Sequence, residues 1–335
     1  MTELIVLELF SGIGGMHYAL KESLVKFKIK AAIDISEKAN ETYKFNNSNI
    51  NVINGNIDGL KVKDYQDVNA ILMSPPCQPF TRNNKTEQRD LNDHRTDAFV
   101  TICKLIKNNE FRNLSYILME NVVGFEKSNM RDIFINALKE NDFFFQEFII
   151  SPHQLNIPNT RHRYYCIARK ISNFKFVQDE ILTTIPGFNI DSQQKLPVSH
   201  YINPSISLDD FKLSTAILEK RFNVLDICTC DSFNSMCFTK SYSKYLEGTG
   251  SVYYSKTRAE LNEKIKEIEQ NNMDIKLKEA LNLRFFSPDE AAHLMCFPDN
   301  FKFPENISKT TAYKLIGNSI CVKVVSELIK ILYHE

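Results

Sequence analysis

The sequence predicts an α/β protein with a mostly parallel sheet, helices on both faces of that sheet, and a second, smaller region. Over about the first 170 residues, short apolar runs alternate with polar helical stretches, which is typical of parallel sheets covered by helices. Two more apolar runs, 143–150 and 163–168, follow with no long helix between them, so we expect an antiparallel hairpin at the sheet edge. The alternation stops near Ile171, and a connector with three prolines, 183–210, leads into the second region.

The predicted strands are short and bounded by polar or glycine-rich segments. They are Leu4–Leu9, Lys30–Asp34, Asn51–Ile53, Ala70–Met73 and Tyr116–Met119. Helices are expected at Gly15–Val25, Glu37–Phe45, Thr96–Lys107, Met130–Glu140, Ser287–Cys296 and Ala312–Leu332. The charged stretch 259–281 has apolar residues at helical spacing and is typical of a solvated helix with one buried stripe. In such sheets, ligands bind outside the carboxyl ends of the strands.

The composition is that of an ordinary globular protein. Of the 335 residues, 43% are hydrophobic and 24% are charged, which excludes a disordered or fibrous chain. The 41 basic and 41 acidic residues leave no net charge, so a nucleic-acid partner would need a local basic face. We expect no secretory signal and no membrane span. The eight scattered cysteines are interpreted as reduced thiols of an intracellular protein.

The first strand runs into a glycine-rich turn and a helix in the segment ELFSGIGG, Glu8–Gly15. Glycines allow a tight turn and let a ligand approach the backbone amides, although a plain strand–helix turn also explains the segment. Its glycines do not have the spacing of a phosphate-binding or dinucleotide-binding loop. Asp34 ends the next strand, where a carboxylate can accept hydrogen bonds from ribose hydroxyls. Together they favour a nucleoside cofactor such as S-adenosylmethionine, with Asn56, Ile57 and Asp58 near its adenine.

The segment SPPCQPFTR, Ser74–Arg82, directly follows the fourth strand. Its prolines restrict the backbone and present Cys77 at the carboxyl edge of the sheet, on the side of the expected cofactor. A thiol held rigidly there is a candidate nucleophile. Four other cysteines are expected to be inert core residues: Cys103, Cys166, Cys296 and Cys321.

The tripeptide ENV at 120–122 follows the next apolar run and brings Glu120 to the same edge. A buried Glu there could have a raised pKa and act as a proton donor; a helix-capping Glu–Asn pair is the alternative. Arg161 and Arg163 alternate on entering a strand, so they would share one face. They suit a carboxylate, a base carbonyl or a phosphate, with a surface ion pair as the alternative. The tripeptide GNS at 317–319 precedes a helix, as many helix N-termini do.

No metal site is predicted. Cys228 and Cys230 form a Cys-x-Cys pair, but neither a second pair nor a suitably spaced histidine completes a zinc site. The seven histidines are isolated in the sequence, and we interpret them as surface or supporting residues rather than catalytic bases.

The ordered motifs FSGIGG, PPCQPF, ENV, Arg-x-Arg and GNS resemble those of the cytosine-5 methyltransferases. At this level the resemblance covers about 1–170 and 283–335, and it implies a Rossmann-like, S-adenosylmethionine-dependent methyltransferase fold. We therefore expect a catalytic domain formed by 1–182 with 283–335, and a small target-recognition region formed by 183–282.

The second region resembles a narrower eukaryotic branch, the type-two DNA methyltransferase homologues, whose members methylate tRNA-Asp at cytosine 38 of the anticodon loop. The segments that carry this likeness are CFTK at 237–240 with Tyr242, EGTGS at 247–251, MHYALKES and AIDISEKAN. Asp34 stands where many DNA enzymes have Glu, and Asn159 where a Gln often stands; both changes are shared with the tRNA branch. Asn56 replaces an adenine-contacting Asp, a contact that Asp58 could supply instead.

The resemblance implies covalent catalysis. The Cys77 thiolate would add to cytosine C6, and Glu120 would protonate or hydrogen-bond N3. Arg163 is implied to hold the base carbonyl O2, with Arg161 bracing Glu120. The implied cofactor contacts are Phe10, Ile13, Gly14, Gly15, Asp34, Ile35, Ile57, Asp58, Ser74, Asn318 and Ser319.

Substrate contacts are expected from Arg82, Lys240, Tyr242 and Lys244. They and the neighbouring basic and tyrosine residues form either an RNA-binding face or solvated charges over a half-buried aromatic surface. A tRNA methyltransferase of the cytoplasm, and also of the nucleus, is the favoured interpretation, with weak DNA binding at most, no membrane contact and no obligate protein partner. A DNA cytosine-5 methyltransferase is the alternative, although no large glycine-rich recognition domain is present. A catalytically silent nucleic-acid-binding protein is disfavoured by the intact Cys77, Glu120 and Arg163.

Overall fold

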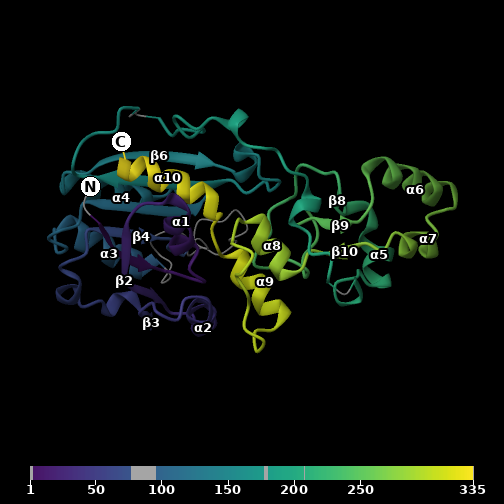
Figure 1. The fold of residues 1–335 in the computed structure, drawn as a ribbon, viewed down its shortest axis with the longest axis horizontal. Helices are drawn as coiled ribbons and strands as arrows, with labels where there is room; N and C mark the ends of the chain where they lie inside the picture. The colour runs from purple at the N-terminus through teal and green to yellow at the C-terminus, as the bar shows by residue number, and fades with distance from the viewer. Residues whose placement is uncertain (1–2, 77–95, 177–179, 207, 335) are drawn as a thin grey trace. The chain divides into compact units, whose positions relative to one another are not determined.

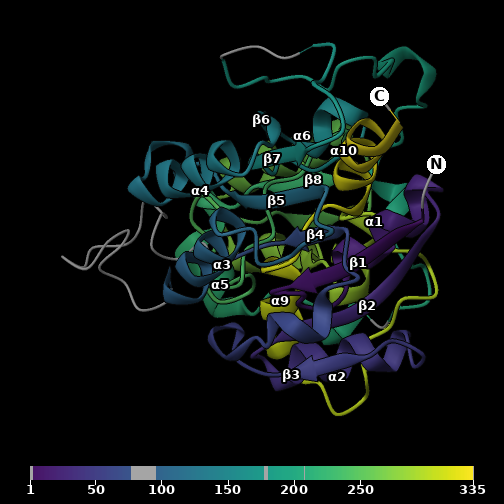
Figure 2. The same cartoon turned by 90° about the vertical axis from the view of Figure 1, so that its left-hand side faces the viewer.

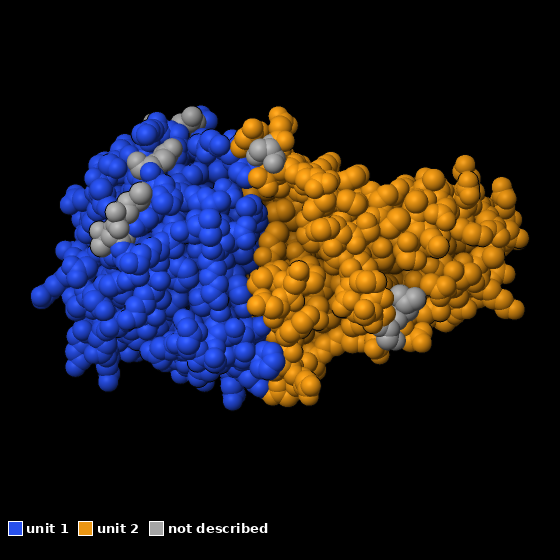
Figure 3. Space-filling view, viewed as in Figure 1, with its two compact units in different colours: residues 1–150, 162–188, 320–335 blue, residues 151–161, 189–319 orange. Residues whose placement is uncertain are grey.

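The computed structural model describes residues 3–76, 96–176, 180–206 and 208–334. The chain forms two compact units, coloured separately in Figure 3. Unit 1 contains Met1–Ile150, His162–Phe188 and Ile320–Glu335, and unit 2 contains Ser151–Arg161 and Asn189–Ser319. These bounds differ from the predicted domain division, because 151–161 and 283–319 group with unit 2. The division into catalytic and recognition parts stays a prediction, since compactness does not show what each part binds.

Unit 1 is built on a seven-stranded sheet in the order β3-β2-β1-β4-β5-β7-β6 (Figure 1). The strands are β1 Leu4–Leu9, β2 Phe27–Asp34, β3 Val52–Asn54, β4 Ala70–Met73, β5 Tyr116–Val122, β6 Phe144–Ile150 and β7 Arg163–Arg169. Strands β1 to β5 pair in parallel, whereas β7 runs antiparallel to both β5 and β6. The predicted α/β class, the mostly parallel sheet and the antiparallel hairpin at its edge are confirmed.

Helices cover both faces of this sheet (Figure 2). They are α1 Gly15–Ser23, α2 Glu37–Asn46, α3 Asp97–Lys107, α4 Asn129–Glu140 and α10 Val322–His334. Helix α1 packs against α10, which also contacts β5 and β7, while α3 packs against α4. The hydroxyls of Ser36 and Ser128 accept backbone hydrogen bonds at the starts of α2 and α4, which explains where these two helices begin.

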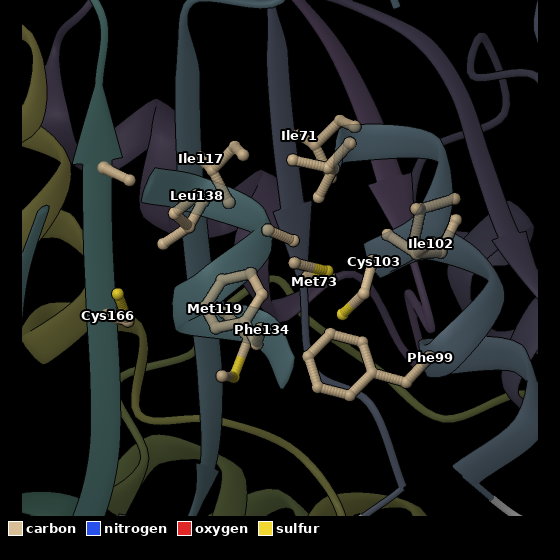
Figure 4. Close-up of a cluster of buried hydrophobic side chains, with 14 of the residues drawn as sticks. Ile71, Met73, Phe99, Ile102, Cys103, Ile117, Met119, Phe134, Leu138 and Cys166 are labelled. Atoms are coloured by element: carbon tan, nitrogen blue, oxygen red, sulfur yellow. The ribbon is translucent and has the colours of Figure 1, made fainter. Parts of the chain in front are cut away.

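The core beneath α3 and α4 explains why the central strands are apolar throughout. Side chains of β4 and β5, such as Ile71 and Met119, meet Phe99 and Cys103 of α3 and Phe134 of α4 (Figure 4). All five are at most 2% exposed, and each large apolar side chain of this kind stabilises the fold by roughly 1.5–3 kcal/mol. Polar residues are therefore tolerated mainly at the strand ends, where the candidate site residues lie.

Unit 2 contains a three-stranded sheet in the order β10-β9-β8. Its elements are α5 Thr215–Arg221, β8 Ile227–Thr229, β9 Val252–Tyr254, α6 Arg258–Gln270, α7 Ile275–Ala280, β10 Arg284–Phe285, α8 Pro288–Leu294 and α9 Lys309–Gly317. The stretch predicted as one helix, 259–281, is two helices, because Asn272 and Met273 adopt positive φ between them. Within the described residues, no helix is long and apolar enough to cross a membrane.

The single helix predicted for Ala312–Leu332 is also wrong, since α9 ends at Gly317 and α10 begins at Val322. A Cβ added at Gly317 would lie 2.3 Å from the backbone nitrogen of Lys240 and 2.3 Å from the carbonyl carbon of Thr239. The backbone of this turn therefore packs directly on the 239–240 segment, and only glycine leaves room for it.

We expect Gly317→Ala to lower the free energy of unfolding by about 2–3 kcal/mol, because a methyl group there must displace backbone rather than a flexible side chain. Urea denaturation measures this loss. Gly59→Ala is the matched control, since a Cβ at Gly59 would meet nothing within 4 Å. Equal stability of the two variants would contradict the close approach at Gly317.

Candidate active site

The carboxyl ends of four neighbouring strands of unit 1 meet at one edge. Leu9 of β1 lies opposite both Ile33 of β2 and Met73 of β4, and Met73 lies opposite Met119 of β5. The two central loops are also tied together, since the Ser74 hydroxyl donates to the Phe10 carbonyl at 3.2 Å. Three predicted cofactor residues, Phe10, Asp34 and Ser74, therefore follow or end adjacent strands, and the predicted proton donor Glu120 lies two residues before the end of β5. This is where a sheet of this topology binds its ligands.

The glycine-rich turn after β1 is closed on one side and open on the other. Phe10, Gly12 and Gly14 all have positive φ, at 53°, 55° and 87°. A Cβ at Gly14 would lie 3.0 Å from the Tyr43 ring, whereas a Cβ at Gly12 would meet nothing within 4 Å. The backbone at Gly12 thus borders open space that a ligand can enter. The neighbouring Ser11 hydroxyl is buried and has no hydrogen-bond partner among the described residues.

Asp34 is held beside this turn by two backbone amides. Its Oδ2 accepts from the Gly12 N–H at 2.9 Å, and its Oδ1 accepts from the Ser36 N–H at 2.7 Å. Burial raises the pKa of this carboxyl above its ordinary value, against the opposing effect of these hydrogen bonds. A carboxylate has about four acceptor positions, so two stay available for the hydroxyls of a ribose.

The residues around Asp34 also suit a flat, largely apolar group. Ile35 is 73% exposed, and Ile57 is buried at the start of a short 3-10 helix. Asp58 is exposed, and its carboxylate accepts from the Asn56 amide at 2.9 Å and from the Thr101 hydroxyl at 3.3 Å. Asn56 therefore positions Asp58. The open turn, the partly used Asp34 carboxylate and the exposed Ile35 fit a nucleoside cofactor.

Glu120 and Arg163 form an ion pair at the same end of the sheet. In the β5–β7 pair Val122 lies opposite Arg163, so Glu120 is two residues away along β5. The Arg163 Nε lies 3.4 Å from the Glu120 Oε1, and Glu120 is 7% exposed. The next residue, Asn121, donates its side-chain amide to the Pro75 carbonyl at 3.4 Å. The carboxyl group, the guanidinium group and the segment entering 77–95 are thus tied together.

Two predicted residues lie outside the described residues. They are the candidate nucleophile Cys77 and the candidate substrate contact Arg82. Among the residues that the structure does describe, no group of three or more His, Cys, Asp or Glu side chains is arranged to hold a metal ion.

Arg161 has partners other than the one predicted for it. Its guanidinium is buried and donates to the Cys237 Sγ at 3.2 Å, the Phe238 carbonyl at 3.0 Å, the Gly317 carbonyl at 3.0 Å and the Ser319 carbonyl. These four hydrogen bonds, all within unit 2, hold the 317–319 turn against the 237–238 segment. The support of Glu120 by Arg161 stays a prediction. Asn318 and Ser319 lie on that turn in unit 2, and their contact with the cofactor stays a prediction.

Tyr242 is a structural residue, which corrects its predicted contact with RNA. Its ring is 2% exposed, and its hydroxyl donates to the Ser251 carbonyl at 2.6 Å and accepts from the Phe286 N–H at 3.0 Å. Lys240 and Lys244 are exposed on either side of it in the sequence, and Tyr245 is 56% exposed. The RNA-binding face expected around these exposed side chains stays a prediction.

A buried polar cluster behind the glycine turn was not predicted. Glu8 is fully buried, and its Oε2 accepts from the Tyr43 hydroxyl at 2.6 Å. Burial raises the pKa of Glu8 to about 8 and lowers that of the nearby buried His17 to about 3, so both groups are largely neutral near pH 7. The one signal in the sequence was a charged residue inside the apolar strand LIVLEL.

The sheet order and the polar carboxyl edge fit the Rossmann-like fold of S-adenosylmethionine-dependent methyltransferases. The C-5 cytosine-specific DNA methylase family matches residues 4–334. The chain belongs to this family and is a cytosine-5 methyltransferase. The family implies S-adenosylmethionine as the methyl donor, in agreement with the geometry around Asp34.

Three similar proteins illustrate this membership. A tRNA (cytosine(38)-C(5))-methyltransferase of Spodoptera frugiperda is 43% identical over 98% of this chain and 99% of its own length. A DNA (cytosine-5)-methyltransferase of Dictyostelium discoideum is 37% identical over 99% of this chain and 95% of its own. The crystal structure of a Spodoptera frugiperda DNMT2 mutant superimposes with a TM-score of 0.88 at 42% identity, covering 98% of this chain and 99% of that one.

Lysine substitutions at Arg161 and Arg163 should differ in effect, the first mainly lowering stability and the second mainly lowering activity. Arg161→Lys removes hydrogen bonds from several buried carbonyls, and we expect it to cost at least about 3 kcal/mol of unfolding free energy. Arg163→Lys should cost about 1 kcal/mol and lower kcat at least tenfold, because a lysine cannot reproduce the geometry of a guanidinium beside Glu120. Urea denaturation and methyl-transfer rates measure both. A larger stability loss in Arg163→Lys than in Arg161→Lys would reverse these assignments.

Glu8 should make the protein less stable as pH rises. A carboxyl whose pKa is raised from 4.5 to about 8 on folding stabilises the folded state fully below pH 4.5 and loses that effect as pH climbs towards 8. The coupling between proton binding and folding predicts that the free energy of unfolding falls by roughly 3–4 kcal/mol between pH 5 and pH 8. In Glu8→Gln, whose side chain stays neutral, the free energy of unfolding should change much less with pH. Urea denaturation of both proteins at pH 5, 6.5 and 8 measures this. Parallel curves for both would show that Glu8 does not titrate in this range.

Proposed function

We propose that this enzyme methylates C5 of cytosine 38 in the anticodon loop of tRNA-Asp, through a covalent adduct between Cys77 and C6 of the base. The observation that carries the chemistry is the buried Glu120–Arg163 pair, tied through Asn121 and Pro75 to the segment that leads to Cys77. The tRNA substrate is supported by the 43% identity to a Spodoptera frugiperda protein named for that reaction.

The cofactor is proposed to lie along the carboxyl edge of β1, β2 and β4. Asp34 would accept hydrogen bonds from its ribose, the backbone at Gly12 would border it, and Ile35 with Asp58 would contact its base. Ser74, Asn318 and Ser319 complete the proposed contacts. When bound, S-adenosylmethionine supplies the electrophilic methyl group that becomes attached to C5.

Cytosine C5 is a poor nucleophile, so the chain must first activate the base. The Cys77 thiolate adds to C6 and breaks the C5–C6 double bond, while Arg163 binds the carbonyl O2 and Glu120, which first takes up a proton from solvent, passes that proton to N3. The activated C5 would then bond to the methyl carbon as the bond between that carbon and the sulfonium sulfur breaks, which leaves S-adenosylhomocysteine. Water removes the C5 proton, the double bond reforms as the thiolate leaves C6, and the N3 proton returns to Glu120.

An unpaired base suits this mechanism, because the target must leave its stack to enter such a pocket. A base in an anticodon loop is already partly unstacked, whereas a duplex must be opened at a cost of a few kcal/mol. Lys240 and Lys244, both exposed, are proposed to contact the phosphates. A tRNA substrate also agrees with a cytoplasmic location and a further nuclear pool.

Methylation of DNA is the second candidate, favoured by the 37% identity to a Dictyostelium discoideum protein named as a DNA (cytosine-5)-methyltransferase. The chemistry at Cys77 and Glu120 would be the same. Only the presentation of the base would differ, so the substrate has to be tested directly.

The enzyme should transfer labelled methyl groups to native tRNA-Asp and not to duplex DNA at equal concentration. Cys77→Ala should abolish transfer, because C6 then receives no nucleophile. Glu120→Gln should lower kcat by about 10²- to 10⁴-fold, the usual contribution of a positioned general acid. Glu140→Gln is the matched control, since Glu140 is an exposed carboxylate paired only with Lys107 among the described residues, and its activity should be unchanged.

Labelling of DNA alone would replace the tRNA proposal with the DNA one. Full activity in Cys77→Ala would overturn the covalent mechanism, and labelling of neither nucleic acid would reject both substrates.

A further inference from the structure

Unit 2 contains a cavity that none of the site residues above explains. It has a volume of about 380 Å³ and is lined by parts of three segments: 153–160, Lys195 and 233–234. This volume lies within the range of roughly 300–1,000 Å³ typical of small-ligand sites. A second cavity in unit 2, of about 160 Å³, is smaller than a typical small-ligand site. Its two charged residues, Lys264 and Glu267, already form an ion pair with 2.8 Å between Nζ and Oε2, so neither charge is left for a ligand.

Hydrogen bonds hold the three segments of the larger cavity together. The Asn156 side-chain amide donates to the Ile190 carbonyl at 3.1 Å and to the Gln193 carbonyl at 2.8 Å, which anchors the chain leading to Lys195. The Thr160 hydroxyl donates to the Asn234 Oδ1 at 2.6 Å. The cavity walls are therefore formed before any ligand arrives, which lowers the entropic cost of binding.

The same hydrogen bonds determine what the two amides can offer a ligand. Both hydrogens of the Asn156 amide are used on backbone carbonyls, so its Oδ1 is the atom left to accept. The Asn234 Oδ1 is used by Thr160, so its Nδ2 is the atom left to donate. One acceptor and one donor in the lining match the edge of a nucleobase, which presents both kinds of group.

The remaining lining suits the other parts of a nucleotide. Phe233 is 46% exposed, although large apolar side chains are usually buried, and the Lys195 ammonium lies 5.0 Å from its ring centroid. An exposed ring offers a stacking surface, and a lysine beside it offers a contact for phosphate. No Asp or Glu lines the cavity, so nothing there repels an anion. A protein partner would be expected to find a broader apolar surface than Ile157 and Phe233 provide.

From this juxtaposition of an exposed aromatic ring, a cation and two oriented amides, we infer that the cavity binds one unpaired nucleotide of the RNA substrate, separate from the cytosine that is methylated. Phe233 stacks on its base, Asn156 and Asn234 contact the base edge, and Lys195 contacts its phosphate. The inference rests on the proposed tRNA substrate and adds a second recognised nucleotide to it.

The test is equilibrium binding of the tRNA-Asp anticodon stem-loop to the full chain. Phe233→Ala should weaken binding by about 5- to 150-fold, the effect of losing one base–aromatic stack. Lys195→Ala should weaken it and reduce the salt dependence by about one phosphate contact. Asn234→Asp keeps the acceptor for Thr160 and removes the Nδ2 donor, so it should weaken binding without loss of stability. Met236→Ala and Lys220→Ala, which change an exposed apolar and an exposed basic residue outside the cavity lining, should bind as the unmodified protein does.

A set of stem-loops, each with one abasic nucleotide at a different unpaired position, identifies the base that the cavity binds. At one position other than the target, the abasic RNA should bind weakly to the unmodified protein, and Phe233→Ala should add no further loss, because both changes remove the same stack. Unchanged RNA affinity in Phe233→Ala and Lys195→Ala, or additive losses at every position, would overturn the inference and leave the cavity to another kind of ligand. If tRNA is not methylated but its binding still depends on Phe233, the proposed function fails and the nucleotide site stands.

Discussion

Parallel pairing around β1 is the constraint on which the organisation of unit 1 depends. Because β2 and β4 flank β1 with Leu9 opposite both Ile33 and Met73, their carboxyl ends meet at one edge. The sheet is covered by helices on both faces, so polar side chains are costly along the strands and tolerated mainly where the strands end. The residues that follow β1, β2, β4 and β5 are therefore both free to be polar and close in space. The chemistry of the site is a consequence of that topology.

Glu8 departs from this rule, since it is a charged residue within β1 and is fully buried. Burial is tolerated because the carboxyl is neutral at low and neutral pH and accepts a hydrogen bond from Tyr43. The Tyr43 ring in turn lies where a side chain at Gly14 would be. A buried polar group of β1 thus supports, through Tyr43, the glycine turn that borders the proposed nucleoside site. Because this group titrates, the support depends on pH although the turn itself carries no titratable group.

The parts of the fold that depend on local pattern could be predicted from the sequence. Strand β1 begins and ends where its apolar run does, and α1 begins at the predicted Gly15. Asp34 and Glu120 could be predicted because each occupies the end of an apolar run. The partners of Arg161, the burial of Tyr242 and the helix break at Gly317 could not, because each depends on contacts between segments about 40 to 160 residues apart, or on backbone that approaches too closely for a side chain. The role of the two cavity amides could not be predicted for the same reason. Nothing in the sequence distinguishes Asn156 and Asn234 from other asparagines, and their side chains are oriented only by hydrogen bonds to Ile190, Gln193 and Thr160.

Net charge limits how this protein can bind a polyanion. With 41 basic and 41 acidic residues, no net charge attracts RNA over a long range, and salt weakens any phosphate contact that an exposed lysine makes. Affinity must then come from short-range contacts, of which base stacking and hydrogen bonds to base edges are the least sensitive to salt. Such contacts require unpaired bases, because in a duplex the faces and pairing edges are occupied. An exposed aromatic ring beside oriented amides on a neutral protein therefore suits unpaired bases, which is the same requirement that the proposed chemistry at Glu120 and Arg163 places on the target cytosine.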